Sequence, residues 1–504
     1  MSFLSLEFIL VFTFFLIIYW LLANKPKIQN GLILLGSYAF ISSFSLYATL
    51  VLFAYSTLIY ILSLLSHKIR KKHFPVYLLL LLICIMFFLF KYYDAIREFV
   101  LFIGQFFGFN LGLPLINLAL PIGLSFYLFH SVSLIVEQQK NTRLKYTFFQ
   151  TLTYLSFFPS LVAGPINRVN DTKHQPGLMS QLLSSEYRKM IEPKRAFIYI
   201  LMATFKLWVL SSYLDEWFVN DLFSTPANSS TLTVLIGLYA YAFQIYFNFS
   251  GYSELVLGLG MLLGFRLPLN FKNPYIAENL KQFWDRWHIS LSLFIRDFIY
   301  IPLGGSRSGF LITQLNVLIA MTISGIWHGA GLTFLFWGIL HGVGQIITNC
   351  YSRLIQYRIE KKANIAKALA TFEISKELPV NSSSIKENFF AVFVTKNFYR
   401  LLTFHFICVT WIFFRANSFS DAIAIVEHLF IWDQSALADF NFLTICIIIA
   451  TILFYPSIVK MINAWIEKLV FLNWKYFVLI LILLMQFVIY IAPSGVPGFI
   501  YASF

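Results

Sequence analysis

Long apolar runs recur along the whole chain and constrain its fold more than any other feature. Residues 3–23 form one run, broken only by Glu7, and residues 74–91 form another that is rich in Leu, Ile and Phe. A helix needs about 20 apolar residues to cross the hydrocarbon core of a bilayer. Further runs lie near 47–65, 112–136, 196–214, 231–249, 310–346, 399–414, 442–462 and 474–492.

These runs predict an all-α, multi-pass membrane protein with about eleven transmembrane helices and shorter re-entrant or interfacial helices between them. Composition agrees, because only 12% of the residues are charged, whereas soluble domains carry roughly 25%. We expect one membrane domain over residues 1–504. The run 3–23 is expected to be its first helix, since a basic start and a small-residue cleavage site, the marks of a signal peptide, are missing.

The net charge of +14 is concentrated in the connections between apolar runs. Lys25 and Lys27 follow the first run, and the larger basic stretches are 168–195 and 353–396. Basic connections face the cytoplasm and suit anionic membrane lipids, so the N-terminus is expected outside. Without a soluble domain they do not indicate a nucleic-acid partner. The polar insert 351–398 is predicted to be a cytoplasmic loop with one or two amphipathic helices.

Polar residues enter the apolar sequence repeatedly between about 244 and 345, from Asn248 and Glu254 to His328 and His341. Polar groups at membrane depth are costly, and they usually face a bundle interior or a wet cavity. We therefore expect the functional site in this region.

The segment 282–307 is predicted to form one helix with a polar stripe, which Pro302 ends, and then a turn. Helical spacing places Asp285, His288, Ser292 and Arg296 on one face. The stripe is either the solvated face of an interfacial helix or the wall of a tunnel, with Asp285 and Arg286 orienting His288. The turn after it, which ends at Arg307, lacks the Walker pattern; it is either a plain turn or a phosphate cradle.

His328 lies in a second helix-length segment, 323–342, between Trp327 and Gly329. A helix that starts near residue 314 carries His328 roughly 20 Å along its axis, well inside the bilayer. Such a histidine is either a packed core residue or, when burial keeps it neutral, a proton acceptor for a hydroxyl that attacks a thioester. His341 falls on another helix face, so no metal site is expected.

The sequence has no G-x-S-x-G nucleophile elbow, and no paired cysteines at metal-ligand spacing. Direct, base-assisted transfer is therefore favoured over an acyl-enzyme on serine. A transient acyl group on some other residue stays open, and no bound cofactor is predicted.

Several motifs resemble the membrane-bound O-acyltransferase family, in the bacterial branch of alginate O-acetylation proteins, peptidoglycan O-acetyltransferases and D-alanyl transfer proteins of teichoic acids. The resemblance covers about 120–420. It rests on FWDRWHIS at 283–290, IYIPLGGSR at 299–307 and SGIWHGAGLTFLFWG at 324–338, with LPIGLSFYLFHS at 120–131, FFPSLVAGPINR at 157–168, FNFSGYSE at 247–254 and WIFFRA at 411–416.

The resemblance implies a ring of tilted helices around a thin centre in the bacterial inner membrane. A cytoplasmic funnel lined by His288 would meet an outer opening at His328, which makes these two histidines the catalytic candidates. Lys272, Lys281, Arg286 and Arg307 would hold the phosphates of the donor electrostatically. The candidates for tunnel or donor binding are Asp285, Arg286, Trp287, Ser292, Arg296, Arg307, Trp327, Ser324 and Asn248.

The resemblance also implies acetyl-CoA as the acyl donor, a periplasmic SGNH-type hydrolase-like partner, and a cell-envelope polysaccharide as the final acceptor. Peptidoglycan muramic acid ranks first, alginate or another exopolysaccharide second, and D-alanyl transfer third. The alternatives outside this family are a transporter or flippase and a structural scaffold. A transporter is disfavoured because neither an internal repeat nor an acidic relay is evident.

Overall fold

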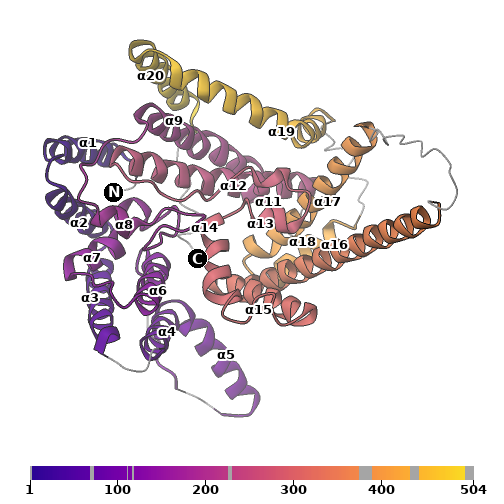
Figure 1. Cartoon of the computed structure of the whole chain (residues 1–504), viewed down its shortest axis with the longest axis horizontal. Helices are drawn as coiled ribbons and strands as arrows, with labels where there is room; N and C mark the ends of the chain where they lie inside the picture. The colour runs from indigo at the N-terminus through magenta and orange to yellow at the C-terminus, as the bar shows by residue number, and fades with distance from the viewer. Residues whose placement is uncertain are drawn as a thin grey trace.

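The computed structural model describes residues 3–68, 73–109, 112–115, 118–224, 230–373, 389–431 and 442–493. Within these residues the regular secondary structure is helical (Figure 1), apart from one β-bridge between Arg168 and Gly177. The all-helical class predicted from the apolar runs is thereby confirmed.

The N-terminal helices pack as one group at the indigo end of the molecule (Figure 1). Their bounds are α1 (Leu6–Leu21), α2 (Pro26–Ser42), α3 (Leu46–Lys68), α4 (Phe74–Phe87), the π-helix η1 (Phe88–Tyr92), α5 (Tyr93–Phe106), α6 (Leu124–Lys140), α7 (Phe148–Ser156), the 3₁₀ turn η2 (Phe158–Ser160) and α8 (Leu178–Leu183).

The middle of the chain forms the centre of the molecule, where α12 is the longest buried helix. The elements are α9 (Pro193–Thr204), η3 (Phe205–Ser211), α10 (Ser212–Leu214), η4 (Asp215–Val219), α11 (Asn220–Ser224), α12 (Thr231–Leu262), η6 (Pro274–Ile276), α13 (Leu280–Trp284), α14 (Ile289–Ile295), η7 (Arg296–Tyr300), α15 (Phe310–His328) and α16 (Leu332–Glu373).

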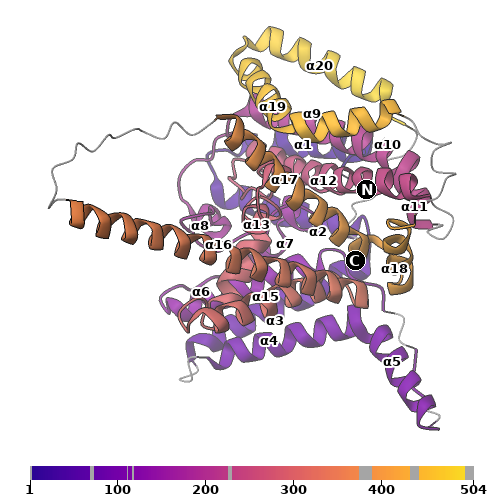
Figure 2. The ribbon, with the colours of Figure 1, turned by 90° about the vertical axis from the view of Figure 1, so that its right-hand side faces the viewer.

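The last helices return over the centre, and α19 and α20 cover the outside of α9 (Figure 2). Their bounds are α17 (Phe389–Arg415), α18 (Phe419–His428), α19 (Phe442–Phe471) and α20 (Trp474–Ile491).

Two apolar clusters hold these helices together, and α12 belongs to both. The half of α12 around Leu255 packs with the N-terminal helices, whereas the half around Tyr241 packs with α13, α17 and α18. Gly258 allows α12 to approach α9 closely, because a Cβ there would lie 2.8 Å from the carbonyl oxygen of Ala196 in α9. This close approach is the small-residue packing typical of membrane helices.

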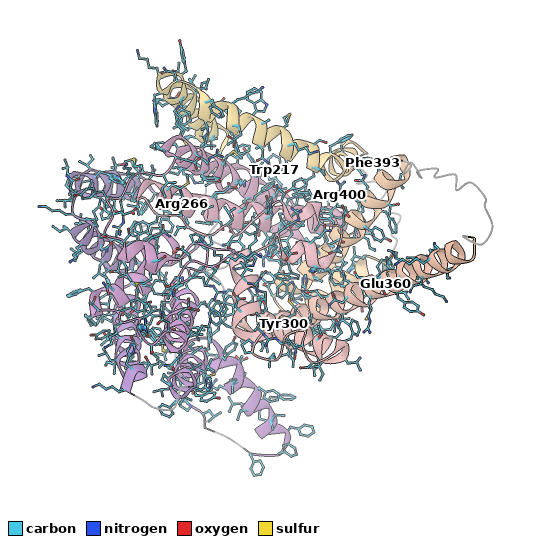
Figure 3. All side chains as sticks on the ribbon, viewed as in Figure 1. Trp217, Arg266, Tyr300, Glu360, Phe393 and Arg400 are labelled. Atoms are coloured by element: carbon cyan, nitrogen blue, oxygen red, sulfur yellow. The ribbon has the colours of Figure 1, made fainter. Side chains whose placement is uncertain are left out.

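Seven helices in the described residues are long and apolar enough to cross a membrane, and α1 is a shorter apolar helix. The sequence count of about eleven treated every apolar run as a span. The run 112–136 shows why the count differs: its helix begins only at Leu124, three residues after Pro121. The polar insert also differs, because α16 continues unbroken to Glu373 and projects from the body, with Glu360 on its exposed part (Figure 3). The rest of the insert up to residue 388 lies outside the described residues.

Candidate functional site

The hairpin of α15 and α16 positions His328. Helix α15 ends at His328, Gly329 is extended, and α16 begins at Leu332. A Cβ on Gly329 would lie 2.2 Å from the ring of Phe334, so only glycine fits at this break. The single helix expected over 323–342 is therefore wrong: His328 is the last residue of a helix and not an interior one.

Aromatic rings enclose the imidazole of His328. Its ring centroid lies 4.6 Å from that of Trp327, 5.2 Å from that of Trp337 and 5.0 Å from that of Phe414. Only 3% of the residue is exposed. The surroundings fix the orientation of the ring and keep bulk water away from it.

His288 occupies a strained turn between α13 and α14. Its φ of +42° lies in the left-handed region, which residues other than glycine rarely adopt. Hydrogen bonds from an adjacent segment hold the turn: the amide of Ile289 donates to the carbonyl of Asn270 (3.0 Å), and the amide of Lys272 donates to the carbonyl of Arg286 (3.0 Å). Strain that is over-determined in this way is common at functional sites.

This turn overturns the prediction of one helix over 282–307. The chain forms the short helices α13 and α14, and the π-helix η7, in its place. Helical spacing consequently fails to describe the face: Asp285 is exposed, whereas His288 is 2% exposed. The guanidinium of Arg286 donates to the carbonyl of Lys272 (3.1 Å). That Asp285 and Arg286 orient His288 stays a prediction.

Trp327 lies between the two candidate histidines. Its ring centroid is 6.4 Å from that of His288 and 4.6 Å from that of His328. On its other side His288 meets the ring of Phe249 edge-on at 4.6 Å. Burial lowers the pKa of His288 to about 3, so its imidazole is neutral at physiological pH. The structure thus brings His288, Trp327 and His328 together at one site.

A third histidine, His341, lies nearer to this site than helical spacing predicted. Because the chain reverses after His328, the ring of Trp337 contacts both His328 (5.2 Å) and His341 (4.7 Å). Nε2 of His341 lies 3.0 Å from the hydroxyl of Thr410, which in turn donates to the carbonyl of Ile407. Among the described residues, no group of three potential ligands is placed to hold a metal ion.

A polar cavity of about 1090 Å³ opens beneath this site. Ser324 lines it, one helical turn before His328, and therefore roughly 6 Å along the helix axis from it. The other polar or charged residues that line this polar cavity are His174, Lys281, Asp285, Ser292, Arg296, Tyr300, Ser306, Thr313, Gln314, Gln345, Asn349, Ser352, Arg353 and Gln356.

Three cations, Lys281, Arg296 and Arg353, surround the polar cavity. Nε of Arg296 contacts the carboxylate of Asp297 (2.8 Å), to which the buried Arg168 also donates (2.9 Å). Arg353 lies over the ring of Phe310, 4.4 Å from its centroid. In the described part of the chain Lys281 and Arg353 form no salt bridge, so their charge is available to an anion.

Sequence reasoning missed the wall of this cavity that α16 provides. Arg353 was counted as part of a basic loop. The signal was nevertheless present as a polar stripe at helical spacing, because Gln345, Asn349, Ser352 and Gln356 recur every three or four residues and line the cavity together with Arg353.

The remaining candidates divide into two groups. Asp285, Ser292, Arg296 and Ser324 line the polar cavity. The others lie outside it: Arg286 clamps the segment at Lys272, Trp287 is a core residue stacked on Phe283, Trp327 separates the histidines, Asn248 is buried in α12, and Arg307 lies exposed in the turn after η7.

The motif at 157–168 braces the site from behind. The amide of Ile166 donates to the hydroxyl of Ser290 (2.9 Å), which follows His288 by two residues. The amide of Asn167 donates to Nε2 of His130 (3.1 Å). His130 therefore holds the backbone of this motif in place.

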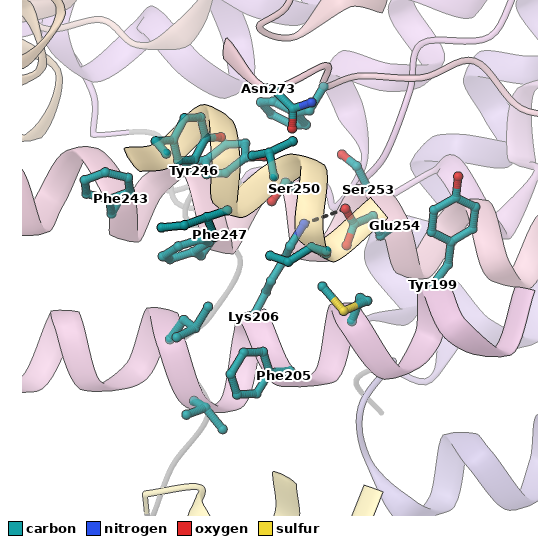
Figure 4. A pocket seen from close by; sticks show the side chains of 18 of the residues that line it. Tyr199, Phe205, Lys206, Phe243, Tyr246, Phe247, Ser250, Ser253, Glu254 and Asn273 are labelled. Atoms are coloured by element: carbon teal, nitrogen blue, oxygen red, sulfur yellow. Dashed lines mark hydrogen bonds and ion pairs between the residues drawn. The ribbon is translucent and has the colours of Figure 1, made fainter. Parts of the chain in front are cut away.

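A second cavity, of about 890 Å³, lies between α9, η3, α12 and α19. Its lining is mostly apolar, with Phe243 and Phe247 among its residues, and we call it the apolar cavity. Figure 4 shows Lys206 reaching across it to the carboxylate of Glu254 in an ion pair. Neither His288 nor His328 lines this cavity or the polar cavity.

Residues 33–372 match the model of MBOAT, the membrane-bound O-acyltransferase family. The chain is similar to a probable alginate O-acetylase of Pseudomonas aeruginosa, with 30% identity over 328 residues (65% of this chain, 55% of the relative). It is also similar to a peptidoglycan O-acetyltransferase of Helicobacter pylori, with 32% identity over 276 residues (55% and 45%), and to a teichoic acid D-alanyltransferase of Streptococcus thermophilus, with 28% identity over 242 residues (46% and 57%). The chain thus spans about half the length of the curated relatives that it matches.

Proposed function

Because the chain belongs to the membrane-bound O-acyltransferase family, we propose that it transfers an acetyl group from acetyl-CoA to a hydroxyl, for O-acetylation of a cell-envelope polysaccharide. The observation that carries the proposal is the polar cavity, which is rimmed by three cations and ends one helical turn below His328.

The polar cavity suits coenzyme A in charge and size. The phosphates of the donor need cations that no carboxylate neutralises, and Lys281 and Arg353 supply them. The volume of about 1090 Å³ is at the upper end of ordinary ligand pockets, as an extended nucleotide thioester requires. Of the four cations expected from the sequence to hold the donor, Lys281 lines this cavity, and Lys272, Arg286 and Arg307 do not.

His328 acts as the general base in the proposed reaction. The imidazole takes the proton of the acceptor hydroxyl as its oxygen attacks the thioester carbonyl. The new C–O bond forms, the C–S bond breaks, and the thiolate of CoA leaves and takes up a proton. A histidine enclosed by Trp327, Trp337 and Phe414 stays neutral and correctly oriented for this step.

His288 has a supporting role in this scheme. It faces Trp327, the residue that separates it from His328, and the strained turn fixes its backbone. We assign to it the orientation of the donor at the inner side of His328. Ser292, four residues later on α14, lines the wall of the polar cavity.

The acceptor is proposed from the relatives. One of them is named a peptidoglycan O-acetyltransferase and another a probable alginate O-acetylase. We rank peptidoglycan muramic acid first and an exopolysaccharide second. A periplasmic SGNH-type partner would carry the acetyl group to the polymer. The inner membrane stays a prediction from the family resemblance, and the outward N-terminus stays a prediction from the basic connections.

The test uses the full chain in nanodiscs, radiolabelled acetyl-CoA, and either muropeptides or a crude periplasmic extract as acceptor. We expect release of CoA together with transfer of label. Label transfer with the extract but not with muropeptides alone would support the requirement for a partner. The proposal fails if neither CoA release nor label transfer occurs with any acceptor while acetyl-CoA binds, and uptake of a solute into vesicles would then favour the transporter alternative.

A further inference from the structure

The C-terminal end of α15 is held by two side chains from a distant part of the chain. Nζ of Lys91 donates to the carbonyl of Trp327 (2.6 Å), and the hydroxyl of Tyr92 donates to the carbonyl of Ile326 (2.6 Å). These carbonyls immediately precede His328. Both donors belong to η1, the π-helix between α4 and α5, and Figure 2 shows α4 running beneath α15.

The end of an α-helix leaves four carbonyl groups without partners inside the helix. In a membrane these groups need donors from the protein, because the hydrocarbon core holds no water. Lys91 and Tyr92 satisfy two of the four, and the ammonium group also complements the negative end of the helix dipole. These bonds therefore determine where α15 stops, and His328 is the residue at which it stops.

Lys91 also contacts the ring of Trp327, the residue that precedes the candidate base His328. Its Nζ lies 5.9 Å from the ring centroid of Trp327, within the range of a cation–π contact. Trp327 in turn contacts both His288 and His328. Neither Lys91 nor Tyr92 lines the polar cavity, so both reach His328 without contacting the proposed donor.

The π-helix itself explains how neighbouring residues come to share this task. A π-helical turn carries an extra residue, and such turns are frequent at functional sites. In η1 it lets the consecutive residues Lys91 and Tyr92 reach consecutive carbonyls of α15. The next residue, Tyr93, points elsewhere, and its hydroxyl donates to the carbonyl of Pro114 (2.6 Å).

We propose that Lys91 and Tyr92 are positioning residues that fix His328 by capping α15. The proposal rests on the proposed function of His328 as the base, and it adds a second element of the fold, the bend between α4 and α5, to the machinery of the reaction. A change in the orientation of α4 and α5 would therefore change the position of His328 through these two hydrogen bonds.

The first test compares Lys91→Ala and Lys91→Arg with the wild type in acetyl transfer. We expect Lys91→Ala to lower kcat about tenfold or more, since a misplacement of 1 Å can cost roughly 100-fold. KM for acetyl-CoA should stay unchanged, because Lys91 is remote from the polar cavity. Lys91→Arg keeps a cationic donor and should restore most of kcat. Equal kcat in Lys91→Ala and wild type would overturn the proposal, as would a rise in KM with kcat intact.

The second test uses two adjacent tyrosines as a matched pair. Tyr92→Phe removes the bond to α15, whereas Tyr93→Phe removes a bond of the same length to a loop. We expect Tyr92→Phe to lower kcat several-fold and Tyr93→Phe to leave it unchanged. Equal loss in both variants would mean that the bend is merely structural, which contradicts the proposal.

A readout that needs no acyl transfer separates this proposal from the proposed function. Diethyl pyrocarbonate modifies accessible imidazoles, and peptide mass spectrometry gives the rate for His328. The buried His328 of the wild type should react slowly, and it should react faster in Lys91→Ala and Tyr92→Phe than in Tyr93→Phe. That ranking would support positioning even if the wild type transferred no acetyl group. Identical rates in all four proteins would overturn it.

Discussion

The two cavities of this protein are similar in size but differ in the polarity of their linings. The polar cavity measures about 1090 Å³ and the apolar cavity about 890 Å³. In the apolar cavity Lys206 is paired with Glu254 and Arg195 with Glu467, whereas Lys272 forms no salt bridge with a described residue. In the polar cavity Lys281 and Arg353 form no salt bridge with any described residue. Volume therefore does not distinguish the two cavities. The polar cavity differs in having two cations without salt bridges and, on its wall, Ser324, which lies one helical turn before His328.

The comparison also separates two ways of handling charge in a membrane protein. A cation that a carboxylate neutralises within the protein stabilises the packing and offers little to a ligand. A cation in a water-filled cavity at membrane depth costs free energy unless an anion binds to it. Substitutions in the two cavities should accordingly act on different measured quantities.

The strongest expected effect comes from His328→Ala. Loss of a general base typically costs 100-fold to 10,000-fold, so we expect kcat to fall at least about 100-fold. Binding of acetyl-CoA should persist, because His328 does not line the polar cavity. Isothermal titration calorimetry measures the binding of acetyl-CoA, and label transfer measures kcat, so the two expectations are checked separately. Full activity in His328→Ala would remove the base assignment and favour a scaffold.

A smaller effect is expected at His288, where ring and backbone can be tested apart. His288→Gly suits the φ of +42° but removes the imidazole, whereas His288→Ala removes the imidazole and keeps the strain. If the ring orients the donor, both variants should lose roughly tenfold in kcat/KM. Wild-type activity in His288→Gly with loss in His288→Ala would show that only the turn geometry matters.

Substitutions of the cavity cations should change KM and spare kcat. Lys281→Ala and Arg353→Ala each remove one partner of the donor phosphates, and we expect KM for acetyl-CoA to rise about threefold to tenfold, with a smaller rise at high salt. Arg358→Ala is the matched control on the same helix, because Arg358 is exposed and does not line the cavity. An equal rise in KM for Arg358→Ala would indicate a general surface effect.

The smallest effect on transfer is expected in the apolar cavity. Lys206→Met leaves the carboxylate of Glu254 unpaired and should lower the free energy of unfolding by about 3 kcal/mol. The double variant Lys206→Met/Glu254→Gln should recover most of that loss. Both should keep wild-type kcat and KM at a temperature where they are folded. A selective loss of transfer, with the thermal midpoint unchanged, would erase the distinction between the cavities.

The class of fold and several residues of the candidate site could be predicted from the sequence because their signals are local. Apolar run length is a local property, and so is the placement of His328 beside Trp327 and one turn from Ser324. The turn at His288 is not local, because it depends on hydrogen bonds from the segment at Asn270 and Lys272. Periodicity assumes an unbroken helix, and it therefore failed at 282–307 and again at Gly329.

Contacts across long stretches of chain were beyond any local pattern. Lys91 and Tyr92 lie more than 230 residues before the carbonyls that they cap. No spacing rule connects η1 with the end of α15. The polar stripe at Arg353, in contrast, has a local signal. Its helical spacing is visible in the sequence, but the residue was placed in the insert 351–398, predicted as a loop with one or two amphipathic helices.

The measurement that tests the central claim most directly is photoaffinity labelling with a diazirine-bearing acyl-CoA, followed by peptide mapping. The account expects label on peptides around Lys281 to Arg296 and around Gln345 to Gln356, with competition by acetyl-CoA. Label on α12 and η3 around Lys206 and Glu254, with none beside the polar cavity, would contradict it.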